Sequence, residues 1–179
     1  DAPEAFGYPT TLAFNGARHR LMPGVRLGAL GDFETNGAPS VSANGDDLTG
    51  VDDEDGVLFP ATVLVGQTAL VPVIASTNGM LDAWIDFNGN GSWGDPGEQV
   101  LASRPLTPGT NLVPFAISPG ALPGLRYVRC RFSTAGGLAP DGFAPDGEVE
   151  DYQLNLLPAV DLVVGLEDLS DPTSVSSNL

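Results

Sequence analysis

Hydrophobic and polar residues alternate over short stretches of this chain, in the pattern of β-strands. In residues 80–87, the odd positions from Leu81 to Phe87 are apolar, whereas Asp82 and Asp86 lie on the other face, with Asp86 at the exposed end of the strand. Similar runs predict strands at residues 25–30, 62–65, 70–75, 111–117, 125–132, 148–156 and 160–166. No stretch has the periodicity of a long amphipathic helix, so we expect an all-β protein.

Turn-forming residues separate these runs. The chain contains 23 Gly and 16 Pro, and the pair Asn-Gly occurs six times. Short strands separated by such turns predict a β-sandwich, of the jelly-roll or immunoglobulin-like kind, with long loops rich in Gly and Asp. Pro72 and Pro114 lack an N–H group, so their strands are expected to be edge strands or to carry bulges.

The pattern divides the chain into a domain, residues 1–157, and a C-terminal extension, residues 158–179. The extension is strand-like over residues 160–166 and then becomes a Ser-rich tail. Its apolar positions are Val160, Leu162, Val164 and Leu166. A lone strand cannot bury these side chains, so we expect a partner: tandem domains of the same polypeptide or the sheet of a neighbouring copy.

The neighbouring copy is the preferred expectation, because the chain ends at Leu179 before a second unit is complete. Such a contact joins a donor strand to a different acceptor surface. Self-association of this kind is heterologous and predicts a head-to-tail filament rather than a closed dimer.

The chain is strongly acidic. It has 23 acidic residues and seven basic ones, all Arg, for a formal net charge of −16. This charge argues against nucleic acid and anionic membranes as partners, and no apolar stretch is long enough to predict a membrane span. Because many of the acids are clustered, we expect cations or Arg to offset their repulsion.

The strongest candidate site is the loop at residues 86–98. Oxygen-bearing side chains at its first, third and fifth positions and Gly91 at the sixth match the first half of an EF-hand loop, which binds Ca²⁺. The expected ligands are Asp86, Asn88, Asn90, Ser92 through its carbonyl, Asp95 and Glu98. The closing Glu98 stands one position late, and strands replace the flanking helices. The alternative is an Asn-Gly-rich hairpin with incidental acids.

Two further acidic runs predict a weaker metal site. The first contains Asp46, Asp47 and Asp52–Asp55, and the second is Glu148–Asp151. The expected ligands of this weaker metal site are Asp52, Asp53, Asp55, Glu148, Glu150 and Asp151. If Tyr152 faces the core, alternation turns Glu148 and Glu150 inward, where each needs a cation. The alternatives are neutralisation by Arg129 or Arg131 and a plain solvated loop.

Groups suited to catalysis are few, and we expect no enzyme. His19 is the only histidine, and the flanking Arg18 and Arg20 should lower its basicity. Cys130 is the only cysteine and is expected to be buried. With no Lys and a single cysteine that is expected to be buried, catalytic triads and Schiff-base chemistry lack parts, although paired carboxylates keep glycoside hydrolysis as a minor alternative.

Calcium-bearing β-sandwiches also suggest a carbohydrate-binding or adhesion module as the alternative function. A glycan would need exposed aromatic rings for stacking. The candidates for that role are Trp84, Trp93, Tyr127 and Phe143.

Several motifs, in this order, resemble the GEVED domain of large modular bacterial secreted proteins. They are Asp1–Pro3, Gly16–His19, Leu27-Gly28 with Asp32 and Glu34, Gly45–Asp47, Val51–Val57, Ala83–Asn88, Gly94-Asp95 with Gly97-Glu98, Arg129–Ser133 and Asp146–Tyr152. The resemblance covers residues 1–157 and implies a non-catalytic, β-rich module found beside adhesion and cell-surface repeats. The extension resembles the first strand of an immunoglobulin-like surface repeat. We therefore expect a secreted, calcium-stabilised structural or assembly module of the cell surface.

Overall fold

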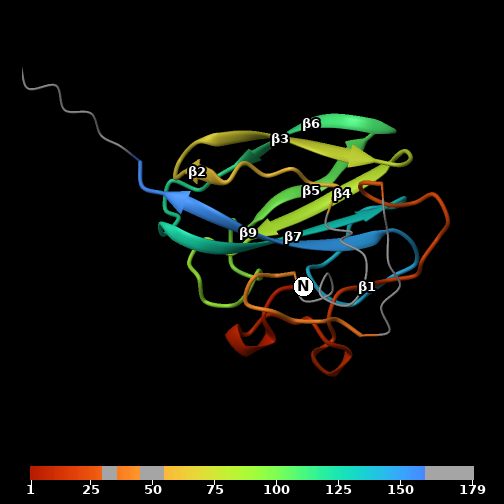
Figure 1. The fold of residues 1–179 in the computed structure, drawn as a ribbon, viewed down its shortest axis with the longest axis horizontal. Helices are drawn as coiled ribbons and strands as arrows, with labels where there is room; N and C mark the ends of the chain where they lie inside the picture. The colour runs from red at the N-terminus through yellow and green to blue at the C-terminus, as the bar shows by residue number, and fades with distance from the viewer. Residues whose placement is uncertain (30–35, 45–54, 160–179) are drawn as a thin grey trace, which may run out of the picture.

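The computed structural model describes residues 1–29, 36–44 and 55–159, which form two layers of β-structure (Figure 1). The larger layer is a five-stranded sheet in the order β2-β9-β7-β4-β5. Its strands are β2 (Thr62–Leu64), β4 (Gly79–Ile85), β5 (Gln99–Leu106), β7 (Gly124–Ser133) and β9 (Glu148–Leu157). The second layer is the antiparallel pair of β3 (Thr68–Ala75) and β6 (Gly109–Ala116).

The remaining elements are short. Strands β1 (Arg18–His19) and β8 (Phe143–Ala144) pair in parallel, and two 3-10 turns, η1 (Glu4–Phe6) and η2 (Leu12–Phe14), lie near the N-terminus. The described part of the chain contains no α-helix. This architecture confirms the predicted all-β sandwich, whereas the jelly-roll or immunoglobulin-like variant stays a prediction.

The main core lies between the five-stranded sheet and the β3–β6 pair. Alternation places Leu81, Ala83 and Ile85 of β4 on this face, as predicted, where all three side chains are fully buried. Val73 of β3 and Phe115 of β6 close the core from the other layer, and both are also fully buried.

The opposite face of the five-stranded sheet is buried as well. The N-terminal segment and the loops before β5 and after β7 cover it, which Figure 1 shows as loop structure below β7 and β9. A second apolar cluster forms there from Ala2, Tyr8, Ala43, Trp84, Trp93 and Tyr127. The acids and arginines of this face are consequently inside the protein rather than on its surface.

Most predicted strands are present with small shifts of their ends, but two predictions differ. Of the strand predicted at residues 25–30, the described part, residues 25–29, forms only the bridge from Leu27 to Ala75 of β3. Strand β5 was not predicted, because its alternation is broken by a bulge at which Ser103 has a φ of 48°. The buried Asp82 carboxylate accepts a hydrogen bond from the Ser103 N–H at 2.7 Å, which supports the bulge.

The predictions for the two prolines and for Cys130 are confirmed. Pro72 and Pro114 lie in β3 and β6, which form a two-stranded sheet and are therefore both edge strands. Cys130 is fully buried, and burial raises the pKa of its thiol well above its usual value. The predicted strand at residues 160–166 lies outside the described residues.

Candidate functional site

The candidate calcium loop begins at Asp86, immediately after β4. Asp86 is not at an exposed end, as the alternation suggested, but is fully buried. Its Oδ1 accepts a hydrogen bond from the Gly89 N–H at 2.6 Å, and its Oδ2 accepts one from the Gly91 N–H at 2.9 Å. The Tyr8 hydroxyl donates to the same Oδ2 at 2.6 Å. The loop therefore curls around this carboxylate.

The side chains of Asn88 and Asn90, nearer the surface, also accept hydrogen bonds from backbone N–H groups of the loop. Asn88 Oδ1 accepts a hydrogen bond from the Asn90 N–H, and Asn90 Oδ1 accepts one from the Ser92 N–H, each at 2.9 Å. Both amide groups donate to Asp95 Oδ2, at 2.8 and 2.6 Å. Asn88, Asn90 and Asp95 therefore converge, with their oxygens on the same small loop.

Glu98 closes the loop immediately before β5 and is also buried. Its Oε1 accepts a hydrogen bond from the Phe87 N–H at 3.0 Å, and its Oε2 accepts one from the Asp95 N–H at 3.4 Å. Burial and then the nearby Asp86 carboxylate raise the pKa of Glu98. Neither acid has an ion-pair partner among the described residues.

The donor set fits Ca²⁺, which prefers carboxylate, amide and carbonyl oxygens. Two buried carboxylates supply negative charge, and two amides and Asp95 supply further oxygens beside them. In the described ranges, no three His, Cys, Asp or Glu side chains are already grouped as a metal site. Binding would therefore require these side chains to turn from one another toward an ion. Sequence reasoning missed Tyr8, for which no local pattern gives a signal.

The second acidic cluster is only partly brought together. Glu148 and Glu150 point to the core face, as predicted, because Glu150 lies opposite Cys130 in the β7–β9 ladder. Glu150 accepts hydrogen bonds from the Gly56 N–H at 3.0 Å and from the Tyr152 hydroxyl at 2.7 Å. The Leu27 N–H donates to Glu148.

Among the remaining predicted ligands of this second site, the Asp55 carboxylate accepts a hydrogen bond from the Ala29 N–H at 3.0 Å. Asp46, Asp47, Asp52 and Asp53 lie outside the described residues. Asp151, by contrast, is on the opposite face of the sheet. The predicted ligands are thus divided between two faces, so Asp151 cannot share one ion with Glu148 and Glu150.

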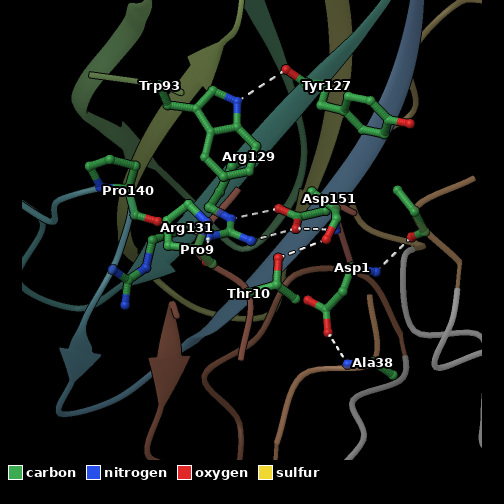
Figure 2. Close-up of polar contacts among 12 residues, drawn as sticks. Asp1, Pro9, Thr10, Ala38, Trp93, Tyr127, Arg129, Arg131, Pro140 and Asp151 are labelled. Carbon is green, nitrogen blue, oxygen red and sulfur yellow. Dashed lines mark hydrogen bonds and ion pairs between the residues drawn. The ribbon is translucent and has the colours of Figure 1, made fainter. Parts of the chain in front are cut away.

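Arg129 and Asp151 lie opposite each other on the face of the sheet that points away from the main core (Figure 2). Arg129 therefore neutralises Asp151 and not Glu148 or Glu150. Arg129 Nε donates to Asp151 Oδ1 at 2.7 Å, and Nη2 donates to Oδ2 at 2.6 Å. Nη1 donates to the carbonyls of Pro9 and Pro140, at 2.8 and 3.0 Å. The guanidinium also lies over the Trp93 ring, 4.3 Å from its centroid.

The same carboxylate holds the N-terminal segment on the sheet. The Ala2 N–H donates to Asp151 Oδ2 at 2.8 Å, and the Asp1 carboxylate accepts from the Ala38 N–H at 2.7 Å (Figure 2). Burial opposes ionisation of Asp151, but Arg129 outweighs it, so the pKa of Asp151 is lowered. A buried ion pair thus joins β7, β9 and the segment before β1.

Arg131 is held differently, by neutral acceptors. Its Nε donates to His19 Nε2 at 3.0 Å, and Nη1 donates to the Ala139 carbonyl at 2.7 Å. His19 Nδ1 lies 2.7 Å from the Asp146 carbonyl. Because Nε2 accepts a hydrogen bond, His19 is neutral and carries its proton on Nδ1.

The pKa of His19 is low, as expected, but for a different reason. Burial lowers it to about 3, and the Arg131 guanidinium adds to the effect; Arg18 and Arg20 are not the cause. Burial also lowers the pKa of Arg131 to about 10, with Arg129 contributing. The predicted role of the sequence neighbours was therefore wrong.

Three of the four rings considered for sugar stacking are not accessible. Trp84, Trp93 and Tyr127 are at most 7% exposed and belong to the second apolar cluster. Trp93 Nε1 donates to the Tyr127 carbonyl at 3.1 Å. Phe143 is 61% exposed and is the remaining ring of that set.

Comparison with known proteins gives a family match for the segment at residues 80–155. No curated protein matches the chain. The family model of the GEVED domain matches residues 80–155, which run from β4 to β9. The matched segment contains the loop at residues 86–98, both buried arginines and the Glu148–Asp151 run. In the described residues, no helix is long and apolar enough to cross a membrane. From the family match, residues 80–155 belong to a GEVED domain.

Proposed function

We propose that this chain is a calcium-stabilised structural module of a secreted or cell-surface protein, and that its C-terminal segment joins it to neighbouring units. The extracellular location rests on the resemblance of its motifs to the GEVED domain of modular secreted proteins. The proposal has two separable parts, an ion and an assembly contact. Each has its own support and its own test.

The observation that supports calcium is the pair of buried carboxylates, Asp86 and Glu98, neither of which forms an ion pair with an arginine of the described residues. Two like charges in a buried site raise the free energy of the folded state unless one is protonated or a cation lies between them. Burial, and then this repulsion from Asp86, raises the pKa of Glu98. A divalent cation would remove it at neutral pH.

The residues around the loop indicate what an ion would stabilise. Asp86 follows β4 and Glu98 precedes β5, so an ion held by both would fix the β4–β5 connection. Asp86 also accepts the Tyr8 hydroxyl, which links the loop to the N-terminal segment. Calcium would supply charge neutralisation and coordination of the loop oxygens, a structural role.

A structural role also agrees with the environment of the other reactive groups. His19 is held by two hydrogen bonds as a neutral acceptor of Arg131. Cys130 is fully buried. Neither group is positioned to act on a substrate, and we propose no catalytic activity.

The calcium proposal is tested by thermal melts with EGTA and with millimolar calcium. At a calcium concentration about a hundredfold above Kd, the free energy of unfolding should rise by about 2.7 kcal/mol. Equal melting temperatures in the two buffers would contradict the proposal.

Glu98→Gln gives a sharper result, because the expected effect changes sign with calcium. In EGTA the variant should be at least as stable as the wild type, since one of two repelling charges is gone. In calcium it should gain much less stability than the wild type. Glu4→Gln, which changes a partly exposed acid in η1, should respond to calcium as the wild type does.

The assembly proposal rests on the apolar positions of residues 160–166, which a lone strand could not bury. Electron microscopy and light scattering of the full chain, compared with a chain lacking residues 160–179, test it. Filaments that need the extension support strand donation. Filaments that persist without it contradict strand donation.

A further inference from the structure

Strand β6 has a backbone edge that no strand of the described residues covers. The Ile74 N–H of β3 donates outward to the Gly56 carbonyl at 2.8 Å, so the backbone groups of Ile74 point away from β6. Thr110 lies opposite Ile74 in the antiparallel ladder. Antiparallel alternation therefore turns the backbone groups of Thr110, and of every second residue up to Ala116, away from β3. None of these outward N–H groups donates a hydrogen bond within the described residues.

The other strand edges are protected. Residues 56–58 and 26–28 cover the outer edge of β3 through hydrogen bonds such as Leu58 N–H to the Pro72 carbonyl, 2.9 Å. Strand β5 carries a bulge and Arg104, and β2 is only three residues long. Bulges, charges and short length all discourage pairing with another strand. By comparison, β6 is long and regular, and only Pro114 interrupts its outward donors.

The side chains along this edge are apolar and exposed. Leu112 is 66% exposed, and Leu70 beside it on the same outer face of β3 is 65% exposed. No residue of β6 is charged, although the chain carries a net charge of −16. A second copy of so acidic a chain meets the least electrostatic repulsion at such a surface.

We propose that the open edge of β6 is the acceptor for residues 160–166 of a second copy; this inference rests on the strand donation proposed above. The donor segment has apolar residues at Val160, Leu162, Val164 and Leu166 and a single acid, Asp161. Backbone hydrogen bonds to Thr110, Leu112 and Ala116 hold the strand, and apolar side chains extend the outer face of the β3–β6 pair. The two-stranded layer then has three strands.

The point where the chain leaves the domain favours a second copy as the donor. Leu157 ends β9, and its carbonyl accepts the Val65 N–H at 2.9 Å, just before β3. Strand β3 therefore lies between this point and the open edge of β6. Only Pro158 and Ala159 separate Leu157 from the donor segment. Reaching the same copy's edge would require passing β3.

A pair of matched substitutions tests the acceptor. Leu112→Lys places a charge on the open edge, whereas Leu70→Lys places the same charge on the covered strand at equal exposure. Leu112→Lys should raise the concentration needed for assembly by at least about tenfold, and Leu70→Lys should leave it nearly unchanged. Because both side chains are exposed, both variants should keep the wild-type melting temperature.

Cross-linking locates the contact directly. A Leu112→Cys chain is mixed with a Val163→Cys or a Val164→Cys chain, one position for each face of the donor strand. A disulfide between copies should form with one of the two, because adjacent strands bring their Cα atoms within about 5.5 Å. Leu70→Cys should form none, and the buried Cys130 does not compete.

The outcomes separate the acceptor from the donor. If removal of residues 160–179 abolishes assembly while Leu112→Lys does not, strand donation stands and the β6 acceptor is overturned. An equal loss of assembly in Leu112→Lys and Leu70→Lys also overturns the β6 acceptor, because the open edge would then matter no more than the covered strand. A full chain that stays monomeric overturns both proposals.

Discussion

Arg129 and Arg131 occupy equivalent positions on one face of β7, yet their charges are accommodated in different ways. Arg129 has a carboxylate, Asp151, and an aromatic ring beside it. Arg131 has the neutral His19 and backbone carbonyls. Removing one partner of a buried ion pair is strongly destabilising, because the other charge stays buried without compensation. A buried cation that is held by neutral acceptors is stable only while those acceptors stay neutral.

Asp151→Asn should therefore destabilise the domain strongly. The substitution leaves the Arg129 charge buried without its carboxylate and weakens the bond to the Ala2 N–H, so we expect a loss of about 3–5 kcal/mol. Urea unfolding measures this loss in the free energy of unfolding. Asp141→Asn, whose side chain accepts only a surface bond from Asn15, should cost little; similar losses in both variants would show that the ion pair is unimportant.

His19 should make stability depend on pH. Its pKa is lowered from 6.5 to about 3, so the folded state binds fewer protons than the unfolded state between these values. The contribution of His19 is complete above about pH 6.5 and is lost as the pH falls toward 3, at up to about 1.4 kcal/mol per pH unit. The free energy of unfolding, measured from pH 7 to 4.5, should fall.

His19→Gln is the control for this slope. The variant cannot titrate, so its stability should depend less on pH over the same range, even if it is lower at pH 7. Because carboxylates titrate equally in both proteins, the difference between the two slopes isolates the histidine. Identical slopes would contradict the neutral, buried state of His19.

At the level of elements, the loop at residues 86–98 is shaped by contact with η1 as well as by its own turns. Gly91 has a φ of +83°, and an added Cβ would lie 1.7 Å from the Phe6 carbonyl oxygen. The glycine is thus required both by its backbone conformation and by the close approach of the N-terminal segment. Its place at the sixth loop position has a structural reason independent of any ion.

Gly91→Ala should consequently displace η1 and destabilise the domain by more than the strain of a positive φ alone, which is about 1 kcal/mol. Gly97→Ala is the matched control, because Gly97 has a φ of +90° with nothing within 4 Å of the added Cβ. Thermal melts of the two variants separate contact from strain. Equal losses would mean that the approach of Phe6 contributes nothing.

At the scale of the whole molecule, net charge opposes compactness. The formal charge is −16, and the arginines that enter the interior are engaged with Asp151 and with backbone carbonyls rather than with the surface acids. Five of the seven arginines then remain to offset repulsion among the other carboxylates. Salt screens such repulsion over a Debye length of about 10 Å at 0.1 M.

Raising the NaCl concentration from about 10 mM to 0.5 M in EGTA should therefore raise the melting temperature, because screening acts mainly on the exposed acids and little on the buried pair. Calcium should reduce the size of this salt effect if it neutralises part of the charge. A melting temperature that falls with salt would show that surface ion pairs, and not repulsion, dominate.

Much of the architecture follows from local pattern. A period of two identifies β4, β7 and β9 and the direction of their core side chains, Cys130 and Glu150 included, because alternate residues of any strand point to opposite faces. The curl of residues 86–98 around Asp86 is likewise local, since it depends on short side chains that bond backbone groups three to five residues ahead. Those features could be predicted without knowing the fold.

Only the tertiary structure decided what covers the second face of the sheet. Local alternation cannot distinguish a face that meets water from one that meets the N-terminal segment, so neither the burial of Asp86 nor its bond to Tyr8 could be predicted. The pairing of Arg129 with Asp151 depends on register between strands 22 residues apart. The sequence by itself determined which residues share a face; long-range contacts, which are set by the packing of the whole chain, determined their partners.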